Sequence, residues 1–153
     1  MDFLRTAKIE KLWKKKAGER RRRTPSEQGF SRGRVFFEQL VREAVESLPK
    51  ELKNRLENVA FLVRDDPPRR SKKWLKEDQE LLGLYHGISQ KDRGFWYGNV
   101  LPDRIIIYRK PLERISANSQ DLRENVRQTV VHEVGHYFGF DEEALRRFEE
   151  DDF

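Results

Sequence analysis

The sequence predicts a single α+β domain, in which a short mixed sheet packs on helices, preceded by a basic N-terminal arm. At 153 residues the chain has the length of one domain and can bury one core. Only 36% of its residues are hydrophobic and 39% are charged, so we expect a small core under a heavily ionised surface. Apolar residues recur at helical spacing in two long segments and form short continuous runs between them. We assign residues 1–33 to the arm and residues 34–153 to the domain.

The domain begins with two predicted helices and a strand. A helix is expected over residues 35–48, where the apolar positions follow helical spacing: Phe36, Leu40, Val41, Ala44, Val45 and Leu48. Pro49 begins a short helix that ends near Glu57, since proline suits the first turn of a helix. The continuous apolar run over residues 59–63 is typical of a strand.

The middle of the chain alternates loops with short strands. Residues 65–73 contain two prolines and many charges, which predict an exposed loop. Residues 81–86 predict a short strand or a turn. Residues 104–108 predict the clearest strand, and its isoleucines run without alternation, so both faces should be covered. Residues 87–100 hold glycines and three consecutive aromatics, which favour a hairpin with a small core over a flexible loop beside the site.

A long amphipathic helix follows near the end of the chain. Its apolar residues recur every four positions: Leu122, Val126, Val130, Val134 and Phe138. Asn118 or Ser119 can cap its start, and Asp121 lies in the first turn, where the helix dipole favours an acid. Gly139 can end the helix because glycine accepts the left-handed conformation.

This helix carries the chemistry-bearing motif H-E-x-x-H, formed by His132, Glu133 and His136. Residues four apart share one helix face, so both imidazoles can bind one ion. A catalytic zinc site uses three protein ligands and a water molecule whose pKa the metal lowers to about 7. Glu133 directly follows the first ligand and is placed to accept the proton. The alternative is a helix whose two histidines are partly buried surface residues.

Three acids after Gly139 are candidates for the third metal ligand. We rank Glu142 first, Asp141 second and Glu143 third. The alternative is that Asp141 caps a short terminal helix whose first turn holds the other two acids. Both interpretations hold together if Asp141 caps, because Glu142 is then freer to face the metal.

Hydrolysis of a peptide also needs a donor for the oxyanion, and His or Tyr often supplies it. His86, Tyr85 and Tyr137 are candidates. For His86, a plain surface histidine is the favoured interpretation.

The positive charge of the chain is concentrated in the arm. Residues 1–34 carry 12 basic and 4 acidic residues (net +8), and the remaining 20 basic and 23 acidic residues give −3. Residues 3–16 can form a basic amphipathic helix, and the run Arg20–Arg23 follows it. Such runs bind nucleic acid or other polyanions in some proteins and are solvated tails in others. We expect weak polyanion binding by the arm.

The absence of cysteine leaves histidine and carboxylate to hold any metal. It also fits a reducing compartment. The sequence has no apolar run of membrane-spanning length and no signal-peptide pattern, so we expect a cytoplasmic protein.

Three segments resemble the small bacterial minimal zincin family of metallopeptidase-like proteins. Residues 132–145, HEVGHYFGFDEEAL, match its H-E-x-x-H-x-x-G-x-x-D signature; residues 82–87, LGLYHG, match L-G-L-Y-x-G; and residues 101–109, LPDRIIIYR, match L-P-D-R-I-x-I-Y/F-R. The likeness covers about residues 34–147 and implies a zincin-like α+β fold, one Zn²⁺ ion and peptidase activity. It implies His132 and His136 as ligands and Glu133 as base. Glu142 stands where the family usually has Asp.

These features favour a zinc-dependent hydrolase, a metallopeptidase that cleaves a peptide or protein substrate. The alternative is a nucleic-acid- or ribosome-associated protein with a structural or vestigial zinc site. A third interpretation is a zinc hydrolase that acts on RNA. Glu133 favours hydrolysis, because a purely structural site does not need that base.

Overall fold

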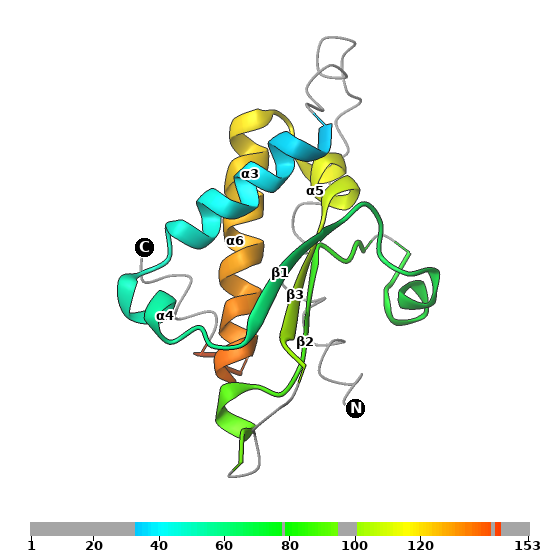
Figure 1. Ribbon diagram of the computed structural model, residues 1–153. Helices are drawn as coiled ribbons and strands as arrows, with labels where there is room; N and C mark the ends of the chain where they lie inside the picture. The colour runs from blue at the N-terminus through cyan, green and yellow to red at the C-terminus, as the bar shows by residue number, and fades with distance from the viewer. Residues whose placement is uncertain (1–32, 78, 95–100, 142, 145–153) are drawn as a thin grey trace.

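Helices α3 and α6 cover one face of a three-stranded mixed sheet (Figure 1). This architecture comes from a computed structural model, which describes residues 33–77, 79–94, 101–141 and 143–144. Its helices and strands are α3 (Gly33–Glu46), α4 (Lys50–Asn54), β1 (Val59–Arg64), β2 (Gly83–His86), β3 (Asp103–Tyr108), α5 (Arg109–Ile115) and α6 (Ser119–Phe138). The predicted α+β class with a short mixed sheet is confirmed. The arm lies outside the described residues, apart from Gly33, where α3 begins.

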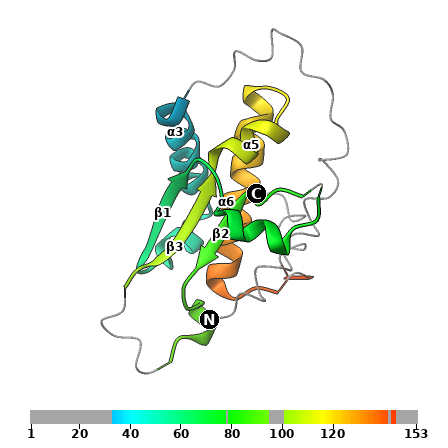
Figure 2. The same cartoon turned by 90° about the vertical axis from the view of Figure 1, so that its right-hand side faces the viewer.

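β3 is the central strand, in the order β1-β3-β2 (Figure 2). β1 runs parallel to β3, with Phe61 opposite Ile105, and β2 runs antiparallel to it, with Tyr85 opposite Ile105. Ile105 and Ile107 are fully buried, whereas Ile106 is half-buried. The expectation that both faces are covered therefore holds fully only for the face under the helices. β2 is an edge strand of this sheet.

The core lies between α3, α6 and the sheet. The buried side chains of α3 are Phe37, Leu40, Val41 and Ala44. Phe37, and not the predicted Phe36, is fully buried; Phe36 packs at the margin of the core. All five predicted apolar positions of α6 are buried.

Both ends of α6 are capped by the residues that the sequence indicates. Asn118 Oδ1 accepts a hydrogen bond from the Asp121 backbone N at 2.9 Å. Gly139 has φ 84° and ends the helix, while its N–H donates to the His136 carbonyl and the Phe140 N–H donates to the Gly135 carbonyl. These two hydrogen bonds form a Schellman cap. Glycine suits the capping position because it takes the left-handed conformation at little cost.

Three segments differ from the sequence-based expectations. The exposed loop over residues 65–73 includes a 3₁₀ helix, Arg69–Trp74. Residues 87–94 contain a 3₁₀ helix, Gln90–Asp92, and no strand, and the aromatics at 95–97 lie outside the described residues. α5 was not predicted, because seven residues are too few to show a helical period.

Within the described ranges, none of the helices combines the length and apolar character of a membrane span.

Candidate metal centre

Helix α6 turns both histidines of the motif toward one point. The Nε2 atoms of His132 and His136 lie 3.1 Å apart, and their ring centroids are separated by 4.8 Å. This convergence follows from the four-residue spacing on a helix. His132 is fully buried and His136 partly buried. The alternative that both are partly buried surface residues is therefore wrong for His132.

The electrostatics of the pair suit a cation. Burial, and secondly the neighbouring His132, lowers the pKa of His136 to about 3. The imidazole is therefore neutral at physiological pH, which is the form that binds a metal. Two imidazole nitrogens that face each other, in a chain without cysteine thiolates, form a donor set that fits zinc.

Glu133 lies in the interior, where α6 crosses β2. Its side chain is 1% exposed. A methyl group on Gly83 of β2 would lie 3.1 Å from Glu133 Cγ, 3.2 Å from its Oε1 and 2.7 Å from Thr129 Cγ2. Helix and strand can approach this closely only because residue 83 has no side chain. The absent side chain at Gly83 thus leaves room for the carboxylate.

The charge of the same carboxylate affects the pKa of Tyr108, the last residue of β3. Burial, and secondly the negative charge of Glu133, raises the pKa of Tyr108 to about 12. The phenol thus stays protonated near neutral pH.

The three candidate acids after α6 differ in what the structure shows of them. Asp141 Oδ1 accepts a hydrogen bond from the Ala144 backbone N at 2.7 Å, so Asp141 has the predicted capping role. Glu143 is exposed, and Glu142 lies outside the described residues. In the part of the chain that the structure describes, no third His, Asp or Glu joins the histidine pair in a possible metal-binding group.

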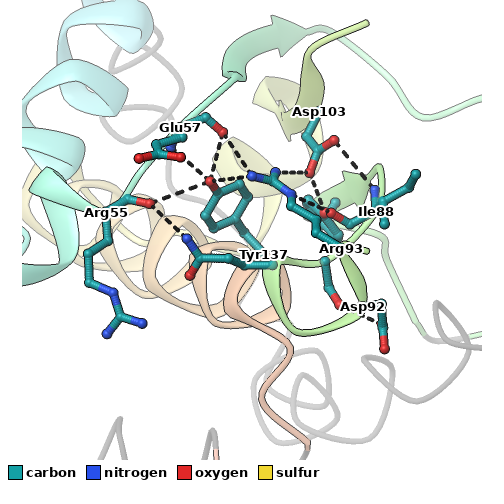
Figure 3. A network of polar contacts seen from close by, with 10 residues as sticks. Arg55, Glu57, Ile88, Asp92, Arg93, Asp103 and Tyr137 are labelled. Atoms are coloured by element: carbon teal, nitrogen blue, oxygen red, sulfur yellow. Dashed lines mark hydrogen bonds and ion pairs between the residues drawn. The ribbon is translucent and has the colours of Figure 1, made fainter. Parts of the chain in front are cut away.

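The three candidate oxyanion donors are engaged elsewhere or lie at the surface. His86 is exposed, with its Nδ1 3.3 Å from Arg104 Nη2, as expected of a surface histidine. The Tyr85 hydroxyl donates to Asp103 Oδ2 at 2.5 Å. The Tyr137 hydroxyl bonds to Glu57 and Arg93 (Figure 3). The structure therefore does not support the two tyrosines in this role.

Sequence reasoning missed the part played by Gly83. Its only local signal was a glycine between apolar residues of a predicted strand, a pattern that suggests close backbone approach. The hydrogen bonds of Arg93 and Asp103 were missed as well. They join residues that are distant in the sequence, and no local period indicates them.

The contact at Gly83 yields a stability prediction. Gly83→Ala should lower the free energy of unfolding by about 1–3 kcal/mol, because the methyl group overpacks against Thr129 Cγ2. Thr129→Ser removes that Cγ2 and keeps the hydroxyl that donates to the Asn125 carbonyl. The cost of Gly83→Ala should therefore be smaller in the Thr129→Ser background, as measured by urea unfolding of all four proteins. An equal cost in both backgrounds would contradict the proposed contact.

Comparison with known protein families connects this geometry with an identified group. A model of a family described as zincin-like metallopeptidases matches residues 56–151, which is more than half of the chain. The match includes β2, β3 and the whole of α6. A search of curated proteins finds no match. The chain belongs to the zincin-like metallopeptidase family.

Proposed function

We propose that the protein is a zinc-dependent peptidase that binds the ion through His132 and His136 and uses Glu133 as general base. The observation that carries this proposal is the convergence of two imidazoles, with a buried carboxylate between them in the sequence. A structural site would need the imidazoles but no such base. Membership of the metallopeptidase family supports the same reaction class.

Zinc bound at this pair would supply a Lewis acid that polarises the scissile carbonyl and lowers the pKa of a water molecule to about 7. The residues of the chain do the remaining work. Glu133 accepts the proton of the attacking water at its carboxylate and passes it to the leaving amine. Gly83 leaves room for this carboxylate, because a methyl group there would lie 3.2 Å from Glu133 Oε1.

Glu142 is our proposed third ligand. Helix α6 ends at Gly139 in the left-handed conformation, and Asp141 Oδ1 accepts a hydrogen bond from the Ala144 N–H. Glu142 follows these two residues and stands at the position where the resembling signature carries its acid.

The edge strand β2 is our proposed site for the peptide substrate. It packs on α6 beside Glu133, and no described strand pairs with its outer edge. An extended peptide can add to such an edge through backbone hydrogen bonds. This mode would place the scissile bond along the motif helix.

Removal of a histidine tests the zinc ligands. His136→Ala should abolish stoichiometric zinc, measured by elemental analysis of protein purified without chelator and after zinc is added. His86→Ala is the matched control, since it removes a histidine that is exposed. A chelator should lower the melting temperature of the wild type, because zinc stabilises the state that binds it. Substoichiometric zinc in the wild type would overturn the metal assignment.

The same titration ranks the acids. Glu142→Ala should weaken zinc binding much more than Asp141→Ala, which loses a cap worth about 1 kcal/mol. Wild-type affinity in Glu142→Ala would show that another residue is the third ligand.

A substitution at Glu133 separates metal binding from chemistry. Glu133→Gln should retain zinc and lose hydrolysis in a peptide-library assay, because an amide does not accept the proton. Cleavage by this variant at the wild-type rate would exclude Glu133 as the base.

A second, independent role is proposed for the arm: weak binding of RNA or another polyanion without sequence preference. Its support is the concentration of positive charge in residues 1–34. If the site proves structural, this binding role would be the alternative function.

The arm prediction uses a charge-matched control. Replacing Arg20–Arg23 by Gln should reduce RNA affinity measured by fluorescence titration. The same change at Arg69, Arg70, Lys72 and Lys73, four exposed residues of the domain, should reduce it less. Log affinity should fall with log salt by about 0.7 per phosphate contact on a single strand. Equal loss in both variants would exclude the arm as the binding element.

A further inference from the structure

A buried ion pair joins the loop after β2 to the start of β3. Arg93 Nη2 donates to Asp103 Oδ2 at 2.9 Å, and the two side chains are only 8% and 4% exposed. Removing two charges from water is costly unless further hydrogen bonds compensate. Here they do: Arg93 Nε donates to the Ile88 carbonyl at 3.1 Å, and Asp103 also accepts from the Tyr85 hydroxyl.

The remaining nitrogen of Arg93 connects this pair to the motif helix. Nη1 donates to the Tyr137 hydroxyl at 3.2 Å and to the Glu57 carbonyl at 3.4 Å. The guanidinium also lies over the Tyr137 ring, 4.8 Å from its centroid. Figure 3 shows Arg93 between Asp103 and Tyr137.

Tyr137 anchors the last turn of α6 through a fully buried hydroxyl. That hydroxyl accepts from the Glu57 backbone N at 2.8 Å and donates to the Glu57 carbonyl at 2.7 Å. The hydrogen bonds from Glu57 and Arg93 thus hold Tyr137, and with it the last turn of α6, in place. Lys91 of the same loop contacts the helix end as well, since a methyl group on Gly139 would lie 2.6 Å from Lys91 Cβ.

The two histidines differ in how the helix itself holds them. His132 lies well inside α6 and is fully buried. His136 lies in the last turn, two residues before the helix ends at Phe138, where helices fray. A metal site tolerates only about 0.2 Å of error in its ligand distances. The Schellman cap at Gly139 holds the backbone of this turn. The hydroxyl of the neighbouring Tyr137 adds a side-chain restraint from outside the helix.

We infer that Arg93 and Tyr137 are positioning residues for the metal site, which hold the last turn of α6 and thereby direct His136 Nε2 toward His132 Nε2. This inference rests on the proposed zinc-binding function. A role in stability alone would be served equally by apolar residues of similar volume, which often replace buried ion pairs without loss.

The test compares two Tyr→Phe variants of the full chain by zinc titration against a competing chelator. Tyr137→Phe removes the hydroxyl at the helix end and keeps the ring under Arg93. Tyr85→Phe removes a hydroxyl from the same group of contacts, but on β2. We expect Tyr137→Phe to weaken zinc binding by about tenfold, the lower end for residues that orient ligands. Tyr85→Phe should keep near-wild-type affinity even where both variants lower the melting temperature alike.

Arg93→Lys provides a second variant at the other side of the contact. Lysine keeps the positive charge opposite Asp103. It lacks the guanidinium Nη1 that donates to both the Tyr137 hydroxyl and the Glu57 carbonyl. Its zinc affinity should fall toward that of Tyr137→Phe. Equal zinc affinity in wild type, Tyr137→Phe and Arg93→Lys would overturn the inference and leave the zinc site intact.

Hydrogen exchange of the metal-free protein gives a readout without zinc. Tyr137→Phe should speed exchange of the backbone amides of residues 136–140, whereas Tyr85→Phe should not. Unchanged exchange there would overturn the inference. A wild type that binds no zinc would instead overturn the proposed function and, with it, the assignment of Arg93 and Tyr137 to a metal site.

Discussion

The close packing of α6 on β2 determines where the histidines and the carboxylate of the motif lie. Gly83 has no side chain, and Thr129 and Glu133 of the helix occupy the space that a side chain there would fill. This approach buries the carboxylate and sets the motif helix beside an edge of the sheet. The chemistry-bearing face and the proposed peptide site thus arise from one packing contact.

The helix that makes this contact carries polar residues at positions that would otherwise be apolar. Asn125 and Thr129 are fully buried, and each is hydrogen-bonded: Asn125 Nδ2 donates to Ser116 Oγ, and Thr129 Oγ1 donates to the Asn125 carbonyl. These bonds avoid the cost of buried, unsatisfied polar groups. Four residues further along lies Glu133, whose burial a stable core alone would not require. Asn125, Thr129 and Glu133 thus form one row of buried polar residues on α6, and its last member is the proposed general base.

Local patterns predicted the elements but not the contacts that assemble them. The four-residue apolar period, Asn118 and Gly139 indicated α6 and both of its ends, and the motif placed both imidazoles on one face. The same reasoning chose Phe36 over Phe37, because neighbouring aromatics fit the helical period almost equally well and only packing on α6 and the sheet separates them. The contacts of Arg93 with Asp103 and Tyr137 span ten and 44 residues, so no local rule could indicate them. Asp141 is a local case: its sequence position suggested either a cap or a metal ligand, and the structure shows the capping bond.

We propose that the histidine pair and a carboxylate hold a zinc ion with one position left for substrate. A crystal structure with anomalous data at the zinc edge, from protein crystallised with zinc and no chelator, would show this ion. We expect one anomalous peak at about 2.0–2.1 Å from the Nε2 atoms of His132 and His136, with a third protein ligand after Gly139 and an open position toward β2. Absence of a peak would contradict metal binding, and a site closed by four protein ligands would contradict catalysis.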